Sequence, residues 1–313
     1  MQFNHISVLK NESISGLNIK PDGVYVDCTL GGGGHSLEIA KRLETGRLIC
    51  FDKDEDAIAY ASTVLDEHMH KITIIHDNFR NIKQCLNELG ISKVDGILCD
   101  LGVSSYQLDT AERGFSYRYD ARLDMRMDKS KGMSAYDVVN TYTDKELQKI
   151  LFNYGEEKNT FAIVKKIINL RQVKPIETTF ELKDIVTSCY PPKDRNKPAL
   201  ANKVFQAIRI EVNHELDDLD SLEDMIDLLN EGGRLCVITF HPLEDRIAKN
   251  VFKLHSTDCL CPPHFPKCVC GHHSDVKLIS KKPIMPSEEE LINNSRAASA
   301  KLRVIEKCCK HDK

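Results

Sequence analysis

Short apolar runs alternate with amphipathic segments along the first hundred residues and again near residue 235. Each run is rich in Val, Ile and Leu and ends at a polar residue; the runs occupy residues 23–29, 46–52, 71–77, 94–102 and 232–241. The segments between the first four have apolar residues three and four positions apart, which is typical of helices; they are 36–44, 55–68 and 79–90. Strands that alternate with helices predict a parallel sheet with helices on both faces.

The alternation stops after Gly102 for about a hundred residues. That stretch has loop signals and helical patterns at 143–157, 159–172 and 178–189, after which the alternation resumes with a long helical pattern at 202–230. Because the strand series continues beyond the interruption, an insertion is favoured over a separate domain. We therefore predict one α/β domain formed by residues 1–102 plus 206–313, and an inserted helical domain at 103–205.

Polar residues end the predicted strands, where open parallel sheets bind ligands. These residues are Asp27, Asp52, Asp77, Asp100 and His241. Four glycines, Gly31 to Gly34, follow the first strand and lead into a helix. Such a junction either brings backbone amides close to a ligand or forms a tight structural turn. The dinucleotide pattern G-x-G-x-x-G does not fit, because Ser36 and Leu37 follow His35 where the third glycine should fall.

Asp52 closes the second predicted strand about 25 residues after Asp27, near the spacing at which an acidic residue binds ribose hydroxyls. Its alternative role is a helix N-cap, which Asp54 could equally fill. An adenosine-type ligand without a pyrophosphate motif indicates S-adenosylmethionine rather than NAD. In this interpretation Gly33, Gly34 and His35 meet the methionine end of the cofactor. Phe79 either stacks near the adenine or belongs to the core.

The chain also closely resembles the bacterial small-subunit ribosomal RNA cytosine-N4 methyltransferases, the RsmH (MraW) family. The motifs that carry the resemblance are HISVLKNE (5–12), DCTLGGGGHS (27–36), FDKDEDA (51–57), DLGVSSYQLD (100–109), RGFSYR (113–118), LDMRMD (123–128), YGEE (154–157), FQAIRIEVNHEL (205–216), FHPLEDR (240–246) and SAKLR (299–303). Pro242 stands where the family usually has Ser.

The resemblance implies a Rossmann-like class I S-adenosylmethionine-dependent methyltransferase domain with an inserted helical domain that recognises RNA. The cofactor contacts it implies fall on Gly33, Gly34, His35, Asp52, Phe79, Asp100 and Gln107. The implied substrate is the exocyclic N4 amine of a cytosine in the decoding region of 16S ribosomal RNA, so the expected partner is the small ribosomal subunit, with neither DNA nor a membrane.

The implied reaction needs positioning more than covalent catalysis. An acceptor must hold an amino hydrogen of cytosine, and we assign this catalytic role to Asp100, with the backbone carbonyls of the D-L-G-V turn as the alternative. Base unstacking could use Tyr106, Phe115 or Tyr117. Candidate phosphate contacts, each with a salt bridge as its alternative, are Arg113, Arg118, Arg126, Arg209 and Arg246.

Composition adds two expectations. Net charge is −4, yet residues 101–205 carry 18 Lys and Arg against 14 Asp and Glu, which favours contact between this region and a polyanion. The N-terminus shows no secretory signal pattern and no stretch approaches the length of a membrane span, so we expect a cytoplasmic protein. In that compartment the 12 cysteines are expected to be reduced.

Four of these cysteines form the pattern C-x-C-x6-C-x-C: Cys259, Cys261, Cys268 and Cys270, with His264, His272 and His273 nearby. They either hold a structural zinc ion or belong to a reduced, proline-stiffened loop. No metal is assigned to the predicted active site.

Two other classes of function are compatible with parts of the sequence. A nicotinamide-dependent oxidoreductase is disfavoured by the missing third glycine and by the absence of residues arranged for hydride transfer. A non-catalytic ribosome assembly factor that binds ribosomal RNA and retains the cofactor pocket remains the alternative.

Overall fold

The computed structural model describes residues 7–195, 197, 199–262, 265 and 267–308. His5, Ile6 and His264, which were named above, lie outside these residues. The described chain divides into two compact units, one formed by residues 1–102 and 216–313 and the other by 103–215. The chain passes from the first unit to the second after Gly102, at the predicted boundary. It returns to the first unit after Glu215, whereas the predicted boundary was after residue 205.

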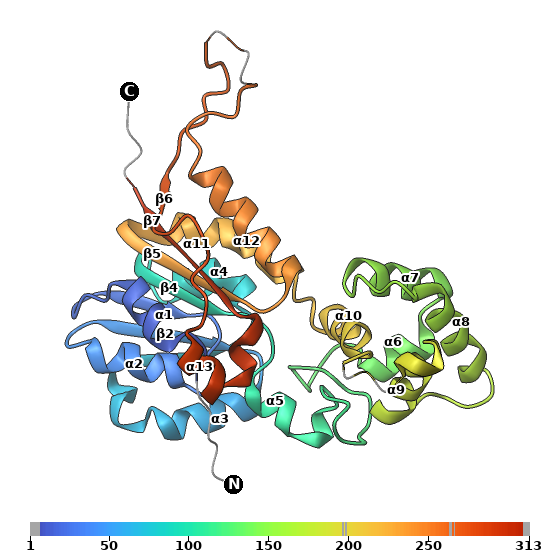
Figure 1. Cartoon of the computed structure of the whole chain (residues 1–313). Coiled ribbons are helices and arrows are strands. Elements are labelled where there is room, and N and C mark those ends of the chain that lie inside the picture. Colours follow the sequence, from blue (N-terminus) through green and yellow to red (C-terminus); the bar gives the residue numbers. More distant parts are fainter. Residues whose placement is uncertain (1–6, 196, 198, 263–264, 266, 309–313) are drawn as a thin grey trace. The chain divides into compact units, whose positions relative to one another are not determined.

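The first unit contains a seven-stranded sheet in the order β3-β2-β1-β4-β5-β7-β6 (Figure 1). Its strands are β1 (Val24–Asp27), β2 (Arg47–Asp52), β3 (Ile72–His76), β4 (Val94–Asp100), β5 (Leu229–Thr239), β6 (Val276–Leu278) and β7 (Lys301–Lys307). The first five strands pair in parallel, and β7 pairs antiparallel with both β5 and β6. The order is that of a Rossmann-like, doubly wound sheet, so the predicted α/β class is confirmed. The two antiparallel strands were not predicted.

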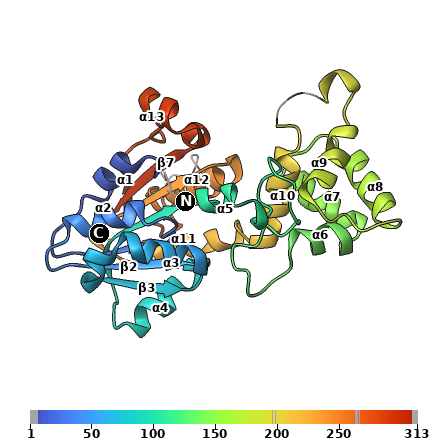
Figure 2. The ribbon, with the colours of Figure 1, turned by 90° about the horizontal axis from the view of Figure 1, so that it is seen from below.

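Helices cover both faces of this sheet (Figure 2). They are α1 (Lys10–Leu17), α2 (Gly34–Arg42), α3 (Glu55–Val64), α4 (Ile82–Glu88), α11 (Leu222–Leu228), α12 (Pro242–His255) and α13 (Glu288–Asn293). Successive side chains of a strand point to opposite faces. Leu48 and Cys50 therefore pack with residues of α1 and α2, whereas Ile49 and Phe51 pack with residues of α4 and α12.

The second unit is helical, as predicted for the insertion. Its helices are α5 (Ser105–Asp109), α6 (Ala135–Thr141), α7 (Asp144–Asn153), α8 (Thr160–Arg171), α9 (Thr179–Ser188) and α10 (Asn202–Asn213). They enclose a hydrophobic core of their own, to which Val204, Phe205 and Ile208 of α10 contribute. Since α10 packs in this core, the boundary between the units falls beyond it.

The single helix predicted for residues 202–230 is wrong. α10 ends at Asn213, because the next residue, His214, has the left-handed backbone conformation with φ 54°. A 3-10 helix, η5 (Asp217–Ser221), and then α11 follow in the first unit.

Candidate active site

Three carboxylates end adjacent parallel strands of the first unit: Asp27 on β1, Asp52 on β2 and Asp100 on β4. The strands β2, β1 and β4 are neighbours in the sheet, with Asp27 level with Cys50 and Leu98. The chain order reverses between β1 and β4, which is where sheets of this kind bind ligands. The expectation that these carboxylates share one edge of the sheet is confirmed.

The glycine run forms a turn with tight backbone geometry rather than a linker. Gly31 and Gly33 have positive φ angles of 48° and 77°, and the amide of Gly33 donates to the carbonyl oxygen of Leu30 over 2.7 Å. A Cβ atom on Gly33 would lie 3.3 Å from the Cβ of Ala61 in α3. Glycine is therefore required here both by the backbone conformation and by the close approach of α3, while Gly34 begins α2.

Asp52 is tied to the glycine turn. Its Oδ2 accepts the amide of Gly31 over 2.7 Å, and its Oδ1 accepts the amide of Asp54 over 2.9 Å. Burial raises the pKa of Asp52 to about 6, although these two amide hydrogen bonds act in the opposite direction. A carboxylate oxygen has two lone pairs, so both oxygens can still accept ligand hydroxyls.

The alternative role of Asp52 as a helix cap is excluded by its neighbour. Asp54 is the N-cap of α3, and its side chain accepts the amide of Asp56 over 3.1 Å. The Asp52 carboxylate therefore serves to accept the amide of Gly31 in the glycine turn and is available to a ligand that lies against it.

Asp27 has a supporting role. Its side chain is 1% exposed and accepts hydrogen bonds from the Ser36 hydroxyl over 2.6 Å and from the Thr29 amide over 3.1 Å. The Thr29 hydroxyl in turn accepts the amide of Asp100 over 2.7 Å. Asp27 therefore ties the end of β1 to the start of α2, and Thr29 ties it to the end of β4.

Asp100 presents an unsatisfied oxygen. Its Oδ1 is buried with no hydrogen-bond partner in the part of the chain that the structure describes. Its Oδ2 lies 3.6 Å from Nδ1 of His35, which is 5% exposed. Burial raises the pKa of Asp100 well above its usual range, and the nearby Asp27 and Glu244 carboxylates raise it further.

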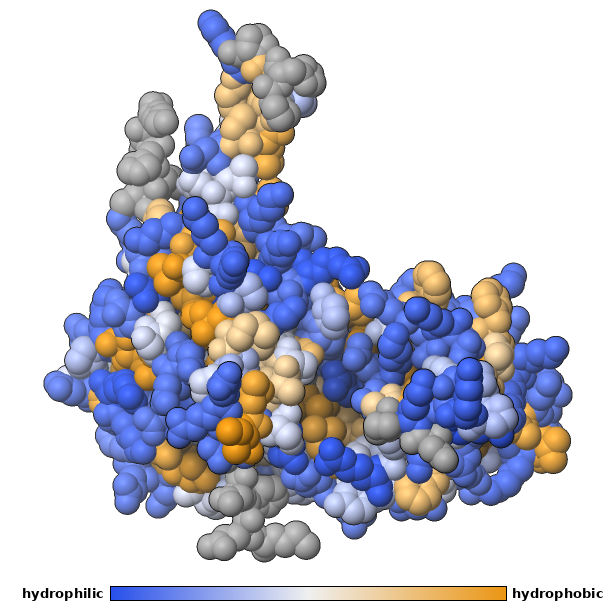
Figure 3. All heavy atoms as spheres, in the orientation of Figure 1, coloured by the Kyte–Doolittle hydropathy of each residue, from blue (hydrophilic) through white to orange (hydrophobic). Residues whose placement is uncertain are grey.

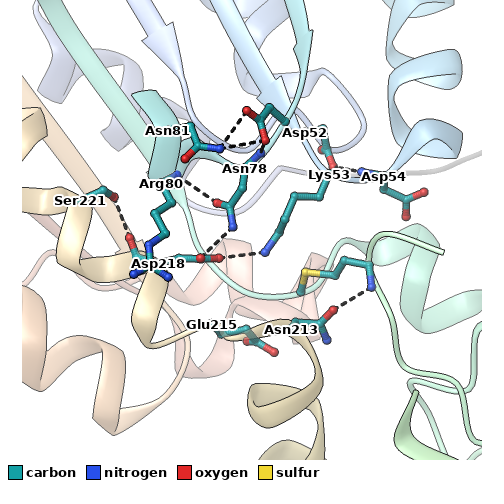
Figure 4. A network of polar contacts seen from close by, with 12 residues as sticks. Asp52, Lys53, Asp54, Asn78, Arg80, Asn81, Asn213, Glu215, Asp218 and Ser221 are labelled. Carbon is teal, nitrogen blue, oxygen red and sulfur yellow. Dashed lines mark hydrogen bonds and ion pairs between the residues drawn. The ribbon is translucent and has the colours of Figure 1, made fainter. Parts of the chain in front are cut away.

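Asp218 belongs to the same side of the sheet and was missed in the sequence. Its buried carboxylate accepts Nζ of Lys53 over 2.9 Å and Nδ2 of Asn78 over 2.7 Å (Figure 4). Lys53 follows Asp52, and Asn78 precedes Phe79, so Asp218 holds the segments after β2 and β3 together. The signal would have been an acidic residue in an apolar helical pattern, but that pattern was interpreted as one continuous helix.

Phe79 and Gln107 both have structural contacts. Phe79 is 7% exposed and packs in the core with Val26 and Phe51. Gln107 lies in the second unit, where its side chain accepts the amide of Ser104 over 3.0 Å in a capping box at the start of α5. Their cofactor roles stay predictions.

Three of the arginines proposed as phosphate contacts bind within the second unit instead. Arg113 is 4% exposed and donates to the carbonyl oxygens of Arg126 and Met127. Arg126 pairs with Asp124, and Arg209 pairs with Glu215 through both oxygens over 2.8 and 2.9 Å. A buried guanidinium that is already bonded cannot reach a phosphate, so Arg113 was assigned wrongly. Arg118 and Arg246 are exposed.

Two of the aromatic residues proposed for base stacking also have internal partners. Phe115 is 6% exposed in the core of the second unit. Tyr117 packs edge-on against Phe205, with ring centroids 5.0 Å apart, and bonds to Asn202.

The donor set of the first unit fits S-adenosylmethionine. The unpartnered Oδ1 of Asp100 suits a cationic amine or an amino hydrogen, and Asp52 suits the two hydroxyls of a ribose. The glycine turn allows close approach of backbone to ligand, and acidic groups at three strand ends disfavour a ligand that carries phosphates.

Comparison with known proteins agrees with this interpretation. The model of the MraW methylase family matches residues 2–308. The chain belongs to that family. Two curated relatives are named ribosomal RNA small subunit methyltransferase H. The one from Finegoldia magna is 56% identical over 98% of this chain and 99% of its own length, and the one from Clostridioides difficile is 56% identical over 98% and 100%.

A solved structure of an rRNA methylase from Streptococcus thermophilus aligns with 97% of this chain and 99% of its own, at 13% identity and a TM-score of 0.43. Membership of the family explains why the predicted motifs recur in order along the whole chain. Pro242, where the family usually has Ser, occupies the first position of α12, where proline removes no helical hydrogen bond. Among the described residues, no helix is long and apolar enough to cross a membrane.

Proposed function

We propose that this protein methylates the exocyclic N4 amine of a cytosine in the decoding region of 16S ribosomal RNA, with S-adenosylmethionine as methyl donor, in the cytoplasm. The observation that carries the proposal is the row of carboxylates at the ends of β2, β1 and β4, in a chain that matches the MraW methylase family from residue 2 to residue 308. The names of the curated relatives support the small ribosomal subunit as the substrate.

The cofactor, when bound, supplies a methyl group on a sulfonium centre that can be displaced in line. The protein contributes orientation and electrostatics. Asp52 accepts the ribose hydroxyls, because each of its oxygens accepts one backbone amide, Oδ2 from Gly31 and Oδ1 from Asp54, and retains acceptor capacity. Gly33 and Gly34, with His35, place the start of α2 against the methionine end.

Asp100 acts on the substrate amine. The lone pair of N4 is delocalised into the cytosine ring, so an acceptor that holds one amino hydrogen makes the nitrogen pyramidal and more nucleophilic. The unpartnered Oδ1 of Asp100 is such an acceptor, and the raised pKa of Asp100 suits it to take the proton that N4 loses as the N–C bond forms.

The second unit contributes RNA recognition. Its basic balance, 18 Lys and Arg against 14 Asp and Glu over residues 101–205, supports contact with a polyanion. Arg113, Arg126 and Arg209 are engaged within this unit. We retain Arg118 of this unit and Arg246 of α12, in the first unit, as phosphate contacts, because both residues are exposed.

The test combines purified protein, isotopically labelled S-adenosylmethionine and small ribosomal subunits that lack the modification, followed by mass spectrometry of the nucleosides. We expect label in N4-methylcytidine at one position of the decoding region. Asp100→Asn should abolish most of the signal, and Asp66→Asn, at an exposed position in the same unit, should leave it unchanged. Label in another nucleoside would contradict the proposed target. Binding of the cofactor and of the subunits without methyl transfer would favour an assembly factor.

A further inference from the structure

Four cysteine side chains converge in the segment that joins α12 to β6. The Sγ atoms of Cys259, Cys261, Cys268 and Cys270 all lie within 4.8 Å of one another. Cys259 and Cys268 are 3.4 Å apart, Cys268 and Cys270 are 3.5 Å apart, and Cys259 and Cys270 are 3.8 Å apart. Four sulfurs bound tetrahedrally at about 2.3 Å from a zinc ion lie about 3.8 Å from one another, so the observed spacing is close to that of a metal site.

Backbone amides support the same four sulfurs. The amide of Cys261 donates to Sγ of Cys259, and the amides of Leu260 and Val269 donate across the segment to Cys270 and Cys261, all over 3.3 to 3.4 Å. Amide donors of this kind stabilise negative charge on sulfur. The two C-x-C pairs are therefore held face to face, with each pair receiving an amide from the other.

Hydrophobic burial does not account for this arrangement. Leu260, Phe265 and Val269 are 50%, 45% and 73% exposed, and apolar side chains gather on the surface of the segment (Figure 3). Its base is closed by His255 and Asp275, whose side chains are 2.7 Å apart. Beyond that closure the described residues form no core that would bring four thiols together.

We propose that Cys259, Cys261, Cys268 and Cys270 bind one Zn²⁺ ion in a closed, structural site with four thiolate ligands. Four thiols release four protons to the solvent as four Zn–S bonds form, and the ion keeps its oxidation state. With four protein ligands no position remains for water or substrate, so the ion stabilises the segment rather than taking part in catalysis.

Other uses of these residues fit less well. Disulfides require sulfurs about 2.0 Å apart, and all four cysteines are free thiols. His272, which is near in sequence, donates through Nε2 to the carbonyl oxygen of Leu254 over 3.0 Å. Tetrahedral sulfur sites select zinc or iron, and the test separates the two.

The first experiment measures metal in the full-length protein, purified reduced from zinc-supplemented cells, by inductively coupled plasma mass spectrometry. We expect about one zinc ion per chain. Cys268→Ser should lower the zinc content and weaken zinc affinity at least about tenfold. The matched control is Cys308→Ser, because the Cys308 thiol bonds to the carbonyl of Glu306 and lies outside the cluster; it should retain the ion.

A second measurement does not depend on a variant that folds. Co²⁺ added to the metal-free wild-type protein should give sulfur-to-cobalt charge-transfer absorption and tetrahedral d–d bands, which Zn²⁺ abolishes. Removal of zinc with a chelator should make residues 256–275 more susceptible to protease. A zinc content near zero with no cobalt spectrum, iron in place of zinc, or equal metal content in Cys268→Ser and the wild type would each overturn the proposal. None of these readouts depends on methyl transfer.

Discussion

The Nδ1 atom of His35 lies 3.6 Å from one carboxylate oxygen of Asp100, while the other oxygen, Oδ1, has no hydrogen-bond partner among the described residues. Nε2 of His35 lies 3.1 Å from the carbonyl oxygen of Val8, and since a carbonyl only accepts, Nε2 carries a proton. A neutral His35 therefore turns a lone pair toward the Asp100 carboxylate. Burial raises the pKa of Asp100 and the Asp27 and Glu244 carboxylates raise it further, so this carboxyl group takes up a proton more readily than an ordinary aspartate.

Asp100→Asn is expected to lower kcat by about 100-fold or more, because it replaces an acceptor of the substrate amine with an amide that cannot take a proton. Wild-type activity should rise with pH as Asp100, whose pKa is raised, becomes ionised, and the variant should lack this rise. Initial rates of methyl transfer across a pH series measure both effects. A variant with full activity and the same pH profile would remove Asp100 from the mechanism.

Asp52→Ala is expected to weaken S-adenosylmethionine binding by about 10- to 100-fold, since hydrogen bonds to a charged acceptor contribute about 1.5–3 kcal/mol. Calorimetric titration measures the change. In the wild type, affinity should also fall as the pH drops through about 6, where Asp52 becomes protonated. Asp54→Ala, which removes the side-chain cap of α3 and leaves the Asp52 carboxylate in place, serves as the control and should affect stability more than affinity.

The same pKa shift determines how Asp52 affects folding. Its folded pKa is about 6, above the value of about 3.9 for an unfolded chain. Protonated Asp52 therefore favours the folded state, and its stabilising effect is complete below the unfolded pKa and lost as the pH rises through the folded one.

For the cofactor-binding prediction, an unchanged affinity of Asp52→Ala for S-adenosylmethionine at neutral pH would contradict the ribose assignment.

The strands that carry the site could be predicted because their burial on both faces makes each an apolar run with a polar end. That pattern alone predicts that Asp27, Asp52 and Asp100 lie at one edge of the sheet. It could not distinguish their roles. Only the hydrogen bonds in the structure separate them. Asp27 accepts hydrogen bonds from Ser36 and Thr29, whereas Oδ1 of Asp100 has no hydrogen-bond partner among the described residues.

Features that depend on residues distant in sequence were missed. In the sequence Arg113 has the character of an RNA contact. In the structure its guanidinium donates to the carbonyl oxygens of Arg126 and Met127, which are 13 and 14 residues away in the chain. The helix predicted for 202–230 ends just before His214, whose backbone is left-handed, close to the boundary between the two units. The spacing of apolar residues does not reveal a left-handed residue, so this break was not predicted. The short antiparallel strands β6 and β7 lack a flanking helix, which was the signal used for the others.

Gly33→Ala is expected to cost more stability than a change at another glycine with the same backbone conformation. An Ala at φ 77° costs about 1–2 kcal/mol in strain, and its Cβ would also press on Ala61 from 3.3 Å. Gly90→Ala is the matched control, because φ is 71° and nothing lies within 4 Å of the added Cβ. Urea denaturation compares the free energies of unfolding, and equal losses would show that contact with α3 is unimportant.

Asp218→Asn is expected to destabilise the first unit by about 1.5–3 kcal/mol, because it removes the buried negative charge that accepts hydrogen bonds from Nζ of Lys53 and Nδ2 of Asn78. It should also weaken cofactor binding, since Lys53 and Asn78 flank Asp52 and Phe79. The control is Asp224→Asn, which breaks an exposed pair with Lys83 and should change stability far less. Guanidinium denaturation and cofactor titration of both variants test this role. If the two variants behaved alike, the network around Asp218 would not be what positions the segments after β2 and β3.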